Sequence, residues 1–258
     1  MIVATVALAA LSLCHAAQAA GTTSLLQLYR DCSSDQDGVI IRLAQLADKG
    51  KLQSYITSAV SPSTLNAFKM LADLHNNKLK DPSDTDTYAV HEVASFFIPH
   101  FAKQFVKLAK RSDTIDWYKF DEKYSHERDI SNIVCGSDNT VSADEYTMYR
   151  IADVMFQNVF TNLCHFRREN WEEFVELVPT LTSNWTFEEM AGSVVSVDFK
   201  HFLAFVFFVS MSNGAKTITA SQWQAMGGNP NHFSDLAHGA QALSWEDWKF
   251  NMGVDRSN

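Results

Sequence analysis

The sequence predicts an all-α protein. Apolar residues recur at the three- to four-residue spacing of amphipathic helices through most of the chain. Helix-start residues such as Ser, Thr, Asp and Pro precede many of these segments. Convincing strands with apolar–polar alternation are missing, and 46% of the residues are hydrophobic, with 18 Phe among them. We therefore expect helices around a large aromatic core.

The N-terminus has the pattern of an export signal. The segment from Ile2 to Leu13 is largely apolar and uncharged, and Ala17-Gln18-Ala19 follows it as a small-residue cleavage pattern, so we expect cleavage after Ala19. This apolar run is shorter than the roughly twenty residues of a bilayer span. The other strongly apolar run, Phe202 to Met211, suits a buried helix. The sequence thus predicts a secreted, extracellular protein with no membrane span.

The helices of the first half of the mature chain have clear boundaries. Ser61 as cap and Pro62 at the first helical position predict a helix that runs to His75. A turn is expected at Asp81-Pro82-Ser83-Asp84. A long helical stretch follows over residues 86–110, and Pro99 is expected to kink or break it.

Shorter helices are predicted for the second half. Gly214 should end the most apolar of them. The expected helices are Asp116 to Tyr124, Ser142 to Phe166, Asn170 to Val178, Thr186 to Ala191, Asp198 to Met211, Thr219 to Met226 and Ser244 to Met252.

A short motif recurs in two couples. Each copy has an aliphatic residue, then Ser, Thr or Asp, then an acid or amide three positions later, then an aromatic, and Lys119 is the exception at the third position. This spacing is typical of a capped helix whose first turn packs into the core. The copies begin at Ile115 and Val141, and again at Ile218 and Leu243, and a weaker couple joins Ile40 with Leu65.

An apolar helix and a short polar loop precede most copies, and the whole resembles the EF-hand superfamily. In that family the aliphatic residue makes a small β-contact with the partner loop. The resemblance implies that Ile115 meets Val141 and that Ile218 meets Leu243. An unrelated helical bundle is the alternative. We divide the chain into an export signal (1–19), an N-terminal helical segment (20–84) and two EF-hand-like pairs (85–178 and 179–258).

Calcium ligands are sparse in these loops. A working loop needs six to eight oxygens, with several carboxylates among them. The best paired loop offers Asp138, Ser142 and Glu145. Near the N-terminus, Asp35 and Asp37 alternate before Gly38, and we interpret this pattern as a surface Asp-Gly turn in preference to a calcium loop. We therefore expect no cofactor, or weak calcium.

Covalent features are few. Cys14 leaves with the signal, so Cys32, Cys135 and Cys164 remain, and this odd number leaves at least one thiol outside an internal disulfide. One helix from Ser142 to Cys164 would hold Cys164 about 30 Å from Cys135. We therefore favour a disulfide of Cys32 with Cys164 or with Cys135. Asn184-Trp185-Thr186 is an N-glycosylation acceptor.

Two functions fit these observations. No nucleophile motif, Gly-rich phosphate loop or zinc signature is present, so we expect no enzyme, and neither the formal net charge of −9 nor any dense Lys/Arg run suggests nucleic acid. The first function is a non-enzymatic EF-hand-like protein that binds a protein partner or has a structural role. The alternative is a carrier of a small apolar ligand. Its cavity would be lined by Phe96, Phe97, Phe205, Phe207 and Phe208, which also fit a filled core.

Overall fold

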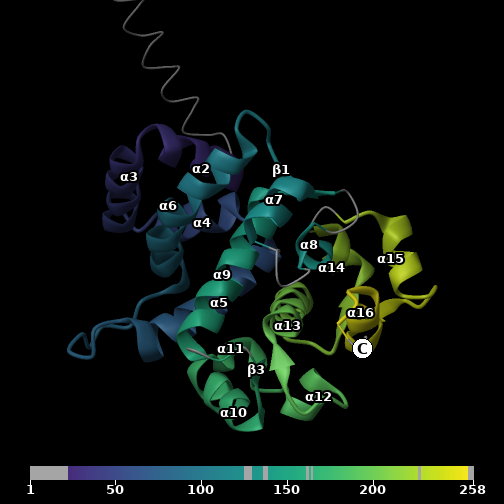
Figure 1. The fold of residues 1–258 in the computed structure, drawn as a ribbon. Helices are drawn as coiled ribbons and strands as arrows, with labels where there is room; N and C mark the ends of the chain where they lie inside the picture. The colour runs from purple at the N-terminus through teal and green to yellow at the C-terminus, as the bar shows by residue number, and fades with distance from the viewer. Residues whose placement is uncertain are drawn as a thin grey trace, which may run out of the picture.

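The all-α prediction is confirmed by a computed structural model of the chain, in which helices predominate (Figure 1). The structure describes residues 23–124, 130–135, 139–160, 163, 165–225 and 228–254. The expected export signal, Asp138 and Cys164 lie outside these ranges. Within them, the only sheets are three short two-stranded ladders.

The described part of the N-terminal segment is mainly helical. Its elements are α2 (Leu25–Ser34), α3 (Gln36–Asp48), α4 (Leu52–Ala59), α5 (Pro62–Leu74) and the π-helical turn η1 (His75–Leu79). Ser61 caps α5 as predicted, because its hydroxyl accepts from the Thr64 N–H. The expected Asp-Gly surface turn is wrong: Asp35 is the N-cap of α3 and accepts from the Gly38 N–H at 3.0 Å. The adjacent acids therefore begin a helix rather than a loop.

Helix α6 (Val90–Ala109) continues through Pro99, so the predicted break does not occur. Proline removes one backbone hydrogen bond. Burial offsets that cost, because Phe101 and Phe105 lie on a face of α6 that packs against α2 and α5. The turn at Asp81 is confirmed, since its carboxylate accepts from the Ser83 N–H at 2.8 Å.

Both predicted loop pairings are confirmed. Strands β1 (Ile115–Asp116) and β2 (Thr140–Val141) form an antiparallel ladder in which Ile115 pairs with Val141. Strands β5 (Thr217–Thr219) and β6 (Ala242–Ser244) form another, in which Ile218 pairs with Leu243. We call these the first pair and the third pair. The weaker couple is wrong, because Ile40 lies in α3 and Leu65 in α5.

A middle pair joins β3 (His165–Phe166) to β4 (Val197–Asp198), with Phe166 opposite Val197. Its formation corrects the long helix expected from Ser142 to Phe166. Helix α9 (Ala143–Val159) ends earlier, and the Phe166 ring stacks on Phe160 with centroids 4.1 Å apart. The two strands of this ladder lie on opposite sides of residue 179, which is the boundary expected between the two EF-hand-like pairs.

Apart from α13, the remaining helices have ten residues or fewer. They are α7 (Trp117–Tyr124), α8 (Ser131–Val134), α10 (Arg168–Leu177), α11 (Pro179–Thr182), α12 (Phe187–Ala191), α13 (Phe199–Ser212), α14 (Ala220–Ala225), α15 (Pro230–Leu236) and α16 (Trp245–Asn251). Helix α13 is buried along almost its whole length, and it packs against α5, α9 and α16 (Figure 1). It ends at Asn213, which adopts the left-handed conformation with φ 55°, and Gly214 follows with φ 80°. Among the described residues, no helix combines the length and the apolarity that crossing a membrane requires.

Candidate functional site

The three ladders are built on one recurring frame. In each of the six strands a buried apolar residue pairs across the ladder, and a buried aromatic follows five positions later in the next helix. The couples are Ile115 with Phe120, Val141 with Tyr146, Phe166 with Trp171, Val197 with Phe202, Ile218 with Trp223, and Leu243 with Trp248. Each strand therefore fixes the start of a helix to the core.

This frame also contains the signal that sequence reasoning missed. The middle pair has the same apolar-to-aromatic spacing as the other two. The capping positions conceal this pair, because Arg167 stands at the place of the capping hydroxyl or carboxylate, and His201 stands at the place of the acid or amide. The apolar and aromatic positions alone would have revealed it.

The acid or amide of the motif is bound to its own helix cap. The Glu145 carboxylate accepts from the Ser142 N–H and hydroxyl, both at 2.8 Å. The Gln222 side-chain oxygen likewise accepts from the Thr219 N–H at 2.8 Å. In the first pair, Lys119 donates to Asp116 at 2.6 Å instead. The position at which the EF-hand resemblance places the last calcium ligand thus has a capping role in the structure.

The candidate calcium ligands lie on different helices. Ser142 and Glu145 form the capping box of α9, while Asp35 and Asp37 lie at the start of α3. Asp138 is outside the described residues. Across the described ranges, no group of three or more His, Cys, Asp or Glu side chains is placed to hold a metal ion.

Both cysteines within the described residues are buried. Cys32 on α2 is buried and carries a free thiol, so the structure does not contain the disulfide expected between Cys32 and Cys135. Burial, followed by the charge of Asp31, raises the pKa of the Cys32 thiol to about 11. Cys135 is also buried, just after α8. The other expected pairing, of Cys32 with Cys164, involves a residue outside the described ranges.

The five phenylalanines proposed as a ligand cavity fall into two groups. Phe96 and Phe97 on α6 contact each other at 5.2 Å between centroids, and Phe96 is 57% exposed. Phe205, Phe207 and Phe208 are buried on α13. Phe205 and Phe208 both contact the rings of Trp185 and Trp245. In the described part of the chain, no ring contact joins the two groups.

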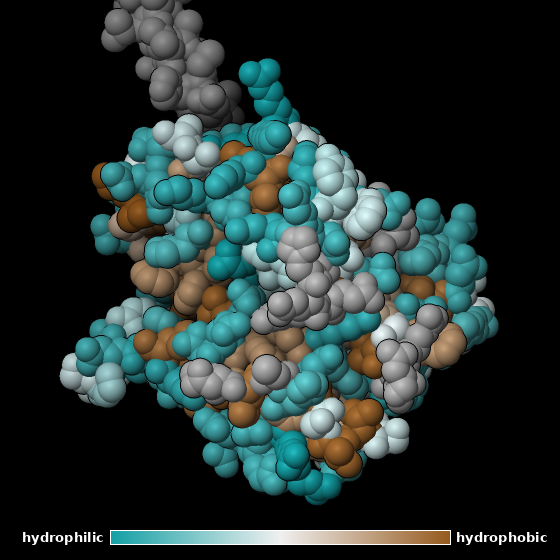
Figure 2. All heavy atoms as spheres, viewed as in Figure 1, coloured by the Kyte–Doolittle hydropathy of each residue, from teal (hydrophilic) through white to brown (hydrophobic). Residues whose placement is uncertain are grey.

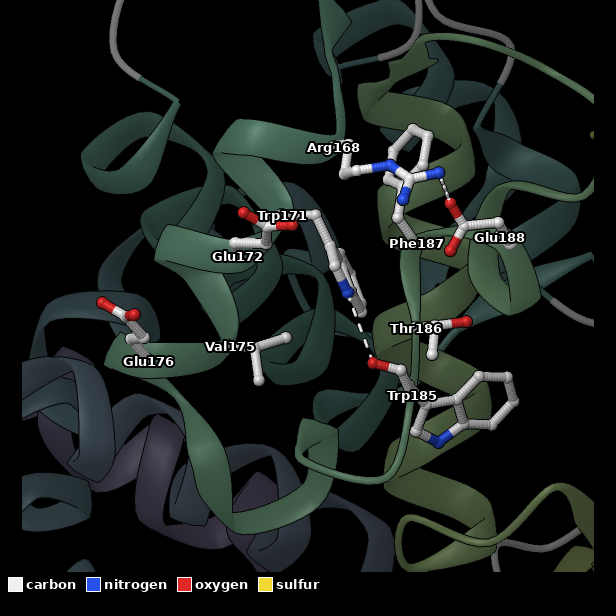
Figure 3. Close-up of a pocket in the computed structure, with 9 residues that line it drawn as sticks. All are labelled: Arg168, Trp171, Glu172, Val175, Glu176, Trp185, Thr186, Phe187 and Glu188. Atoms are coloured by element: carbon white, nitrogen blue, oxygen red, sulfur yellow. Dashed lines mark hydrogen bonds and ion pairs between the residues drawn. The ribbon is translucent and has the colours of Figure 1, made fainter.

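A surface groove of about 410 Å³ lies between α10 and the start of α12, and we call it the α10–α12 groove (Figure 3). Its apolar wall contains Trp171, Val175 and Phe187. The carboxylates of Glu172 and Glu176 extend from α10 at its edge, and both residues are exposed. The groove therefore combines an apolar interior with a negatively charged rim.

One end of the groove is closed by an ion pair between Arg168 and Glu188 (Figure 3). Hydrophobic surface lies near α12, at the bottom of the molecule in Figure 2. Val195, in the segment between α12 and β4, is 81% exposed. The middle pair thus presents apolar groups to solvent on this side.

The groove is anchored to the core through two tryptophans. The Trp171 indole N–H donates to the Trp185 carbonyl at 3.3 Å, and the Trp185 indole N–H donates to the Gly214 carbonyl at 3.1 Å. The Lys216 ammonium lies 3.8 Å from the centroid of the Trp185 ring. These contacts tie the groove to the end of α13 and hold its wall in place.

The glycosylation acceptor borders the groove. Asn184 is exposed in the turn between α11 and α12, and Thr186 lines the groove and caps α12 as predicted. Glu189 closes this capping box. The Lys216 ammonium at 2.7 Å, followed by the Thr186 N–H, lowers the pKa of Glu189. Occupancy of Asn184 by a glycan remains a prediction.

Comparisons of the chain with protein-family models, with curated proteins and with solved structures find no match.

Proposed function

We propose that the protein is a secreted, non-enzymatic EF-hand-like protein that binds a protein partner through the α10–α12 groove. In this proposal the three loop pairs are structural braces, and calcium binding is weak or lost. The observation that carries the proposal is the groove itself, since an apolar wall beside carboxylates suits a protein side chain better than it suits a metal ion or a phosphate.

The chemistry of the groove defines the partner. Trp171, Val175 and Phe187 form the apolar wall, in which Trp171 and Phe187 are buried and Val175 is partly exposed, so Val175 is the group that an aliphatic or aromatic side chain would contact first. The exposed Glu172 and Glu176 would attract a Lys or Arg next to that side chain. The partner is therefore a segment in which an apolar anchor is flanked by a basic residue.

The brace role is supported by the caps. Glu145 and Gln222 stand where a calcium ligand would lie in the EF-hand family, and both accept hydrogen bonds from the caps of their helices. The ladders add backbone hydrogen bonds between distant loops. Export is supported by the N-terminal signal pattern and by the exposed acceptor Asn184.

A peptide selection tests the groove. The mature protein is used to select from a displayed peptide library, and Glu172→Lys/Glu176→Lys serves as the variant. The matched control is Asp48→Lys/Asp86→Lys, which changes exposed acids elsewhere by the same charge. We expect enriched apolar–basic peptides that lose about tenfold or more in affinity on the groove variant but not on the control. A selection that yields no peptide with this dependence would refute the proposed site.

Calcium titration tests the brace role. We expect calorimetry of the mature glycoprotein to show no binding in the sensor range of about 10⁻⁷ to 10⁻⁵ M. Weak binding near about 10⁻³ M that disappears in Glu145→Gln would agree with the proposal. Tight binding that survives this change would overturn it and would direct attention to Asp35 and Asp37.

A further inference from the structure

A second groove, of about 500 Å³, lies between the end of α6 and α7, and we call it the α6–α7 groove. Lys107 lines it from the last turn of α6, and Lys110 lines it from the position that directly follows the helix. Lys119 and Lys123 line it from α7, one helical turn apart. Tertiary structure therefore gathers four ammonium groups from two segments in a chain whose formal net charge is −9.

Few negative charges balance these lysines. Glu122 is the one acid in the lining of the groove, and Asp116 binds Lys119 at 2.6 Å. Lys107, Lys110 and Lys123 are exposed, and within the described ranges none of them forms an ion pair. Like charges that share a groove repel one another, so a bound anion would stabilise this arrangement.

Two further features mark the groove. Lys110 ends α6 with φ 57°, in a region that glycine adopts without strain, so a lysine is held there at a conformational cost. Tyr118 lines the groove and is 54% exposed, with the Lys119 ammonium 5.6 Å from its ring centroid. The site thus offers an aromatic face among cations.

We propose that the α6–α7 groove binds an extended sulfated polysaccharide. Its sulfate groups would be bound by Lys107, Lys110 and Lys123, which line the groove from two segments of the chain. The C–H face of a sugar ring would pack on Tyr118, whose ring carries the complementary partial charge. A polysaccharide is favoured over nucleic acid because export would place the protein outside the cell. The inference therefore rests on the export proposed above, but it does not depend on the α10–α12 groove.

The test uses the full-length mature glycoprotein and a heparin octasaccharide as the probe. Affinity is measured by calorimetry between about 50 and about 200 mM NaCl, for the wild type and for Lys107→Gln/Lys123→Gln. The matched control is Lys49→Gln/Lys51→Gln, which removes the same charge from exposed lysines around the turn between α3 and α4. We expect the groove variant to lose about tenfold or more in affinity and to show a smaller salt dependence. The control should stay within about twofold of the wild type.

Several outcomes would overturn the proposal. These are an octasaccharide that does not bind the wild type, an equal loss in the two double variants, and equal binding of the desulfated octasaccharide. A single-stranded oligonucleotide or a phosphatidylserine vesicle that bound more tightly, with the same lysine dependence, would show a different occupant. A loss of affinity in Tyr118→Ala without a change in salt dependence would support the role of the aromatic face. None of these results depends on whether a peptide binds near Glu172 and Glu176.

Discussion

The first pair and the middle pair share one frame but differ in surface charge. In the first pair, Ile115 and Phe120 are fully buried. In the middle pair, Phe166 is fully buried and Trp171 is 2% exposed. Beside the first pair the α6–α7 groove is lined by four lysines, whereas the α10–α12 groove of the middle pair has Glu172 and Glu176 at its edge. Both pairs share the packed positions of the frame, and the residues between those positions differ in charge.

This difference separates stability from recognition. Positions that pair across a ladder or pack into the core should affect folding equally in the two pairs. Exposed charged positions between them should affect binding, with little effect on folding, while Trp171 belongs to both classes because it also lines the α10–α12 groove. Each measurement below tests one level of that division.

The largest effect is expected at the buried aromatics. Phe120 contacts Tyr124 and Tyr149, and Trp171 contacts Phe174 and Phe205. Phe120→Ala and Trp171→Ala should each lower the free energy of unfolding by about 3–5 kcal/mol in urea titrations, because each leaves a cavity.

The matched control for these variants is Trp117→Ala. Trp117 belongs to the same helix as Phe120 but is 45% exposed. Its removal should change the free energy of unfolding by about 0.5 kcal/mol or less. If Phe120→Ala cost no more than this control, the shared frame would not be structural.

An intermediate effect is expected at the caps. The Ser142 hydroxyl accepts from the Glu145 N–H at 3.2 Å, and the Asp198 carboxylate accepts from the His201 N–H at 2.8 Å. Ser142→Ala and Asp198→Ala should each cost about 1 kcal/mol in the same titrations. Ser142→Thr, which keeps the hydroxyl, should cost less. If only one of the two alanine variants were destabilised, helix capping would not contribute equally to the stability of the first pair and the middle pair.

A smaller effect is expected at the surface ion pairs. Lys119 binds Asp116 and Arg168 binds Glu188; the side chains of the second ion pair are exposed, and those of the first are partly exposed. Lys119→Ala and Arg168→Ala should change the free energy of unfolding by less than about 1 kcal/mol. Thermal unfolding at low and high salt measures both variants. A loss as large as that of Phe120→Ala would contradict the division between frame and surface.

The smallest effect concerns pH, and its sign should be opposite in the two pairs. Lys216 lowers the pKa of Glu189, so the contribution of Glu189 is present above its unfolded pKa of about 4.3 and is lost as pH falls through the folded pKa. Asp116 raises the pKa of Lys119, so that contribution is present below about 10.4 and is lost as pH rises through the folded pKa.

Unfolding at a series of pH values checks this sign. The difference between wild type and Glu189→Gln should shrink in acid, and the difference between wild type and Lys119→Met should shrink in alkali. The reverse order would mean that other partners control these two groups.

Local patterns in the sequence predicted the features that depend on neighbouring residues. Ser61 with Pro62, and Ser142 with Glu145, identified helix starts because capping involves residues three positions apart. The repeated motif also predicted the pairing of Ile218 with Leu243, since each half contains its own signal. The apolar positions Phe166 and Val197 also fit the motif. The middle pair is not predicted when the motif is required to include a capping residue and an acid or amide.

Tertiary structure alone decided the features that depend on distant segments. Pro99 stays within α6 because the helix packs against α2 and α5, and α9 ends at Val159 before a ladder that joins Phe166 to Val197. The four lysines of the α6–α7 groove come from two separate segments of the chain, so no local run of lysines predicts the groove. The physical reason is the same in each case: capping and helical periodicity act within a few residues, whereas burial and electrostatic fields sum over side chains that only folding brings together.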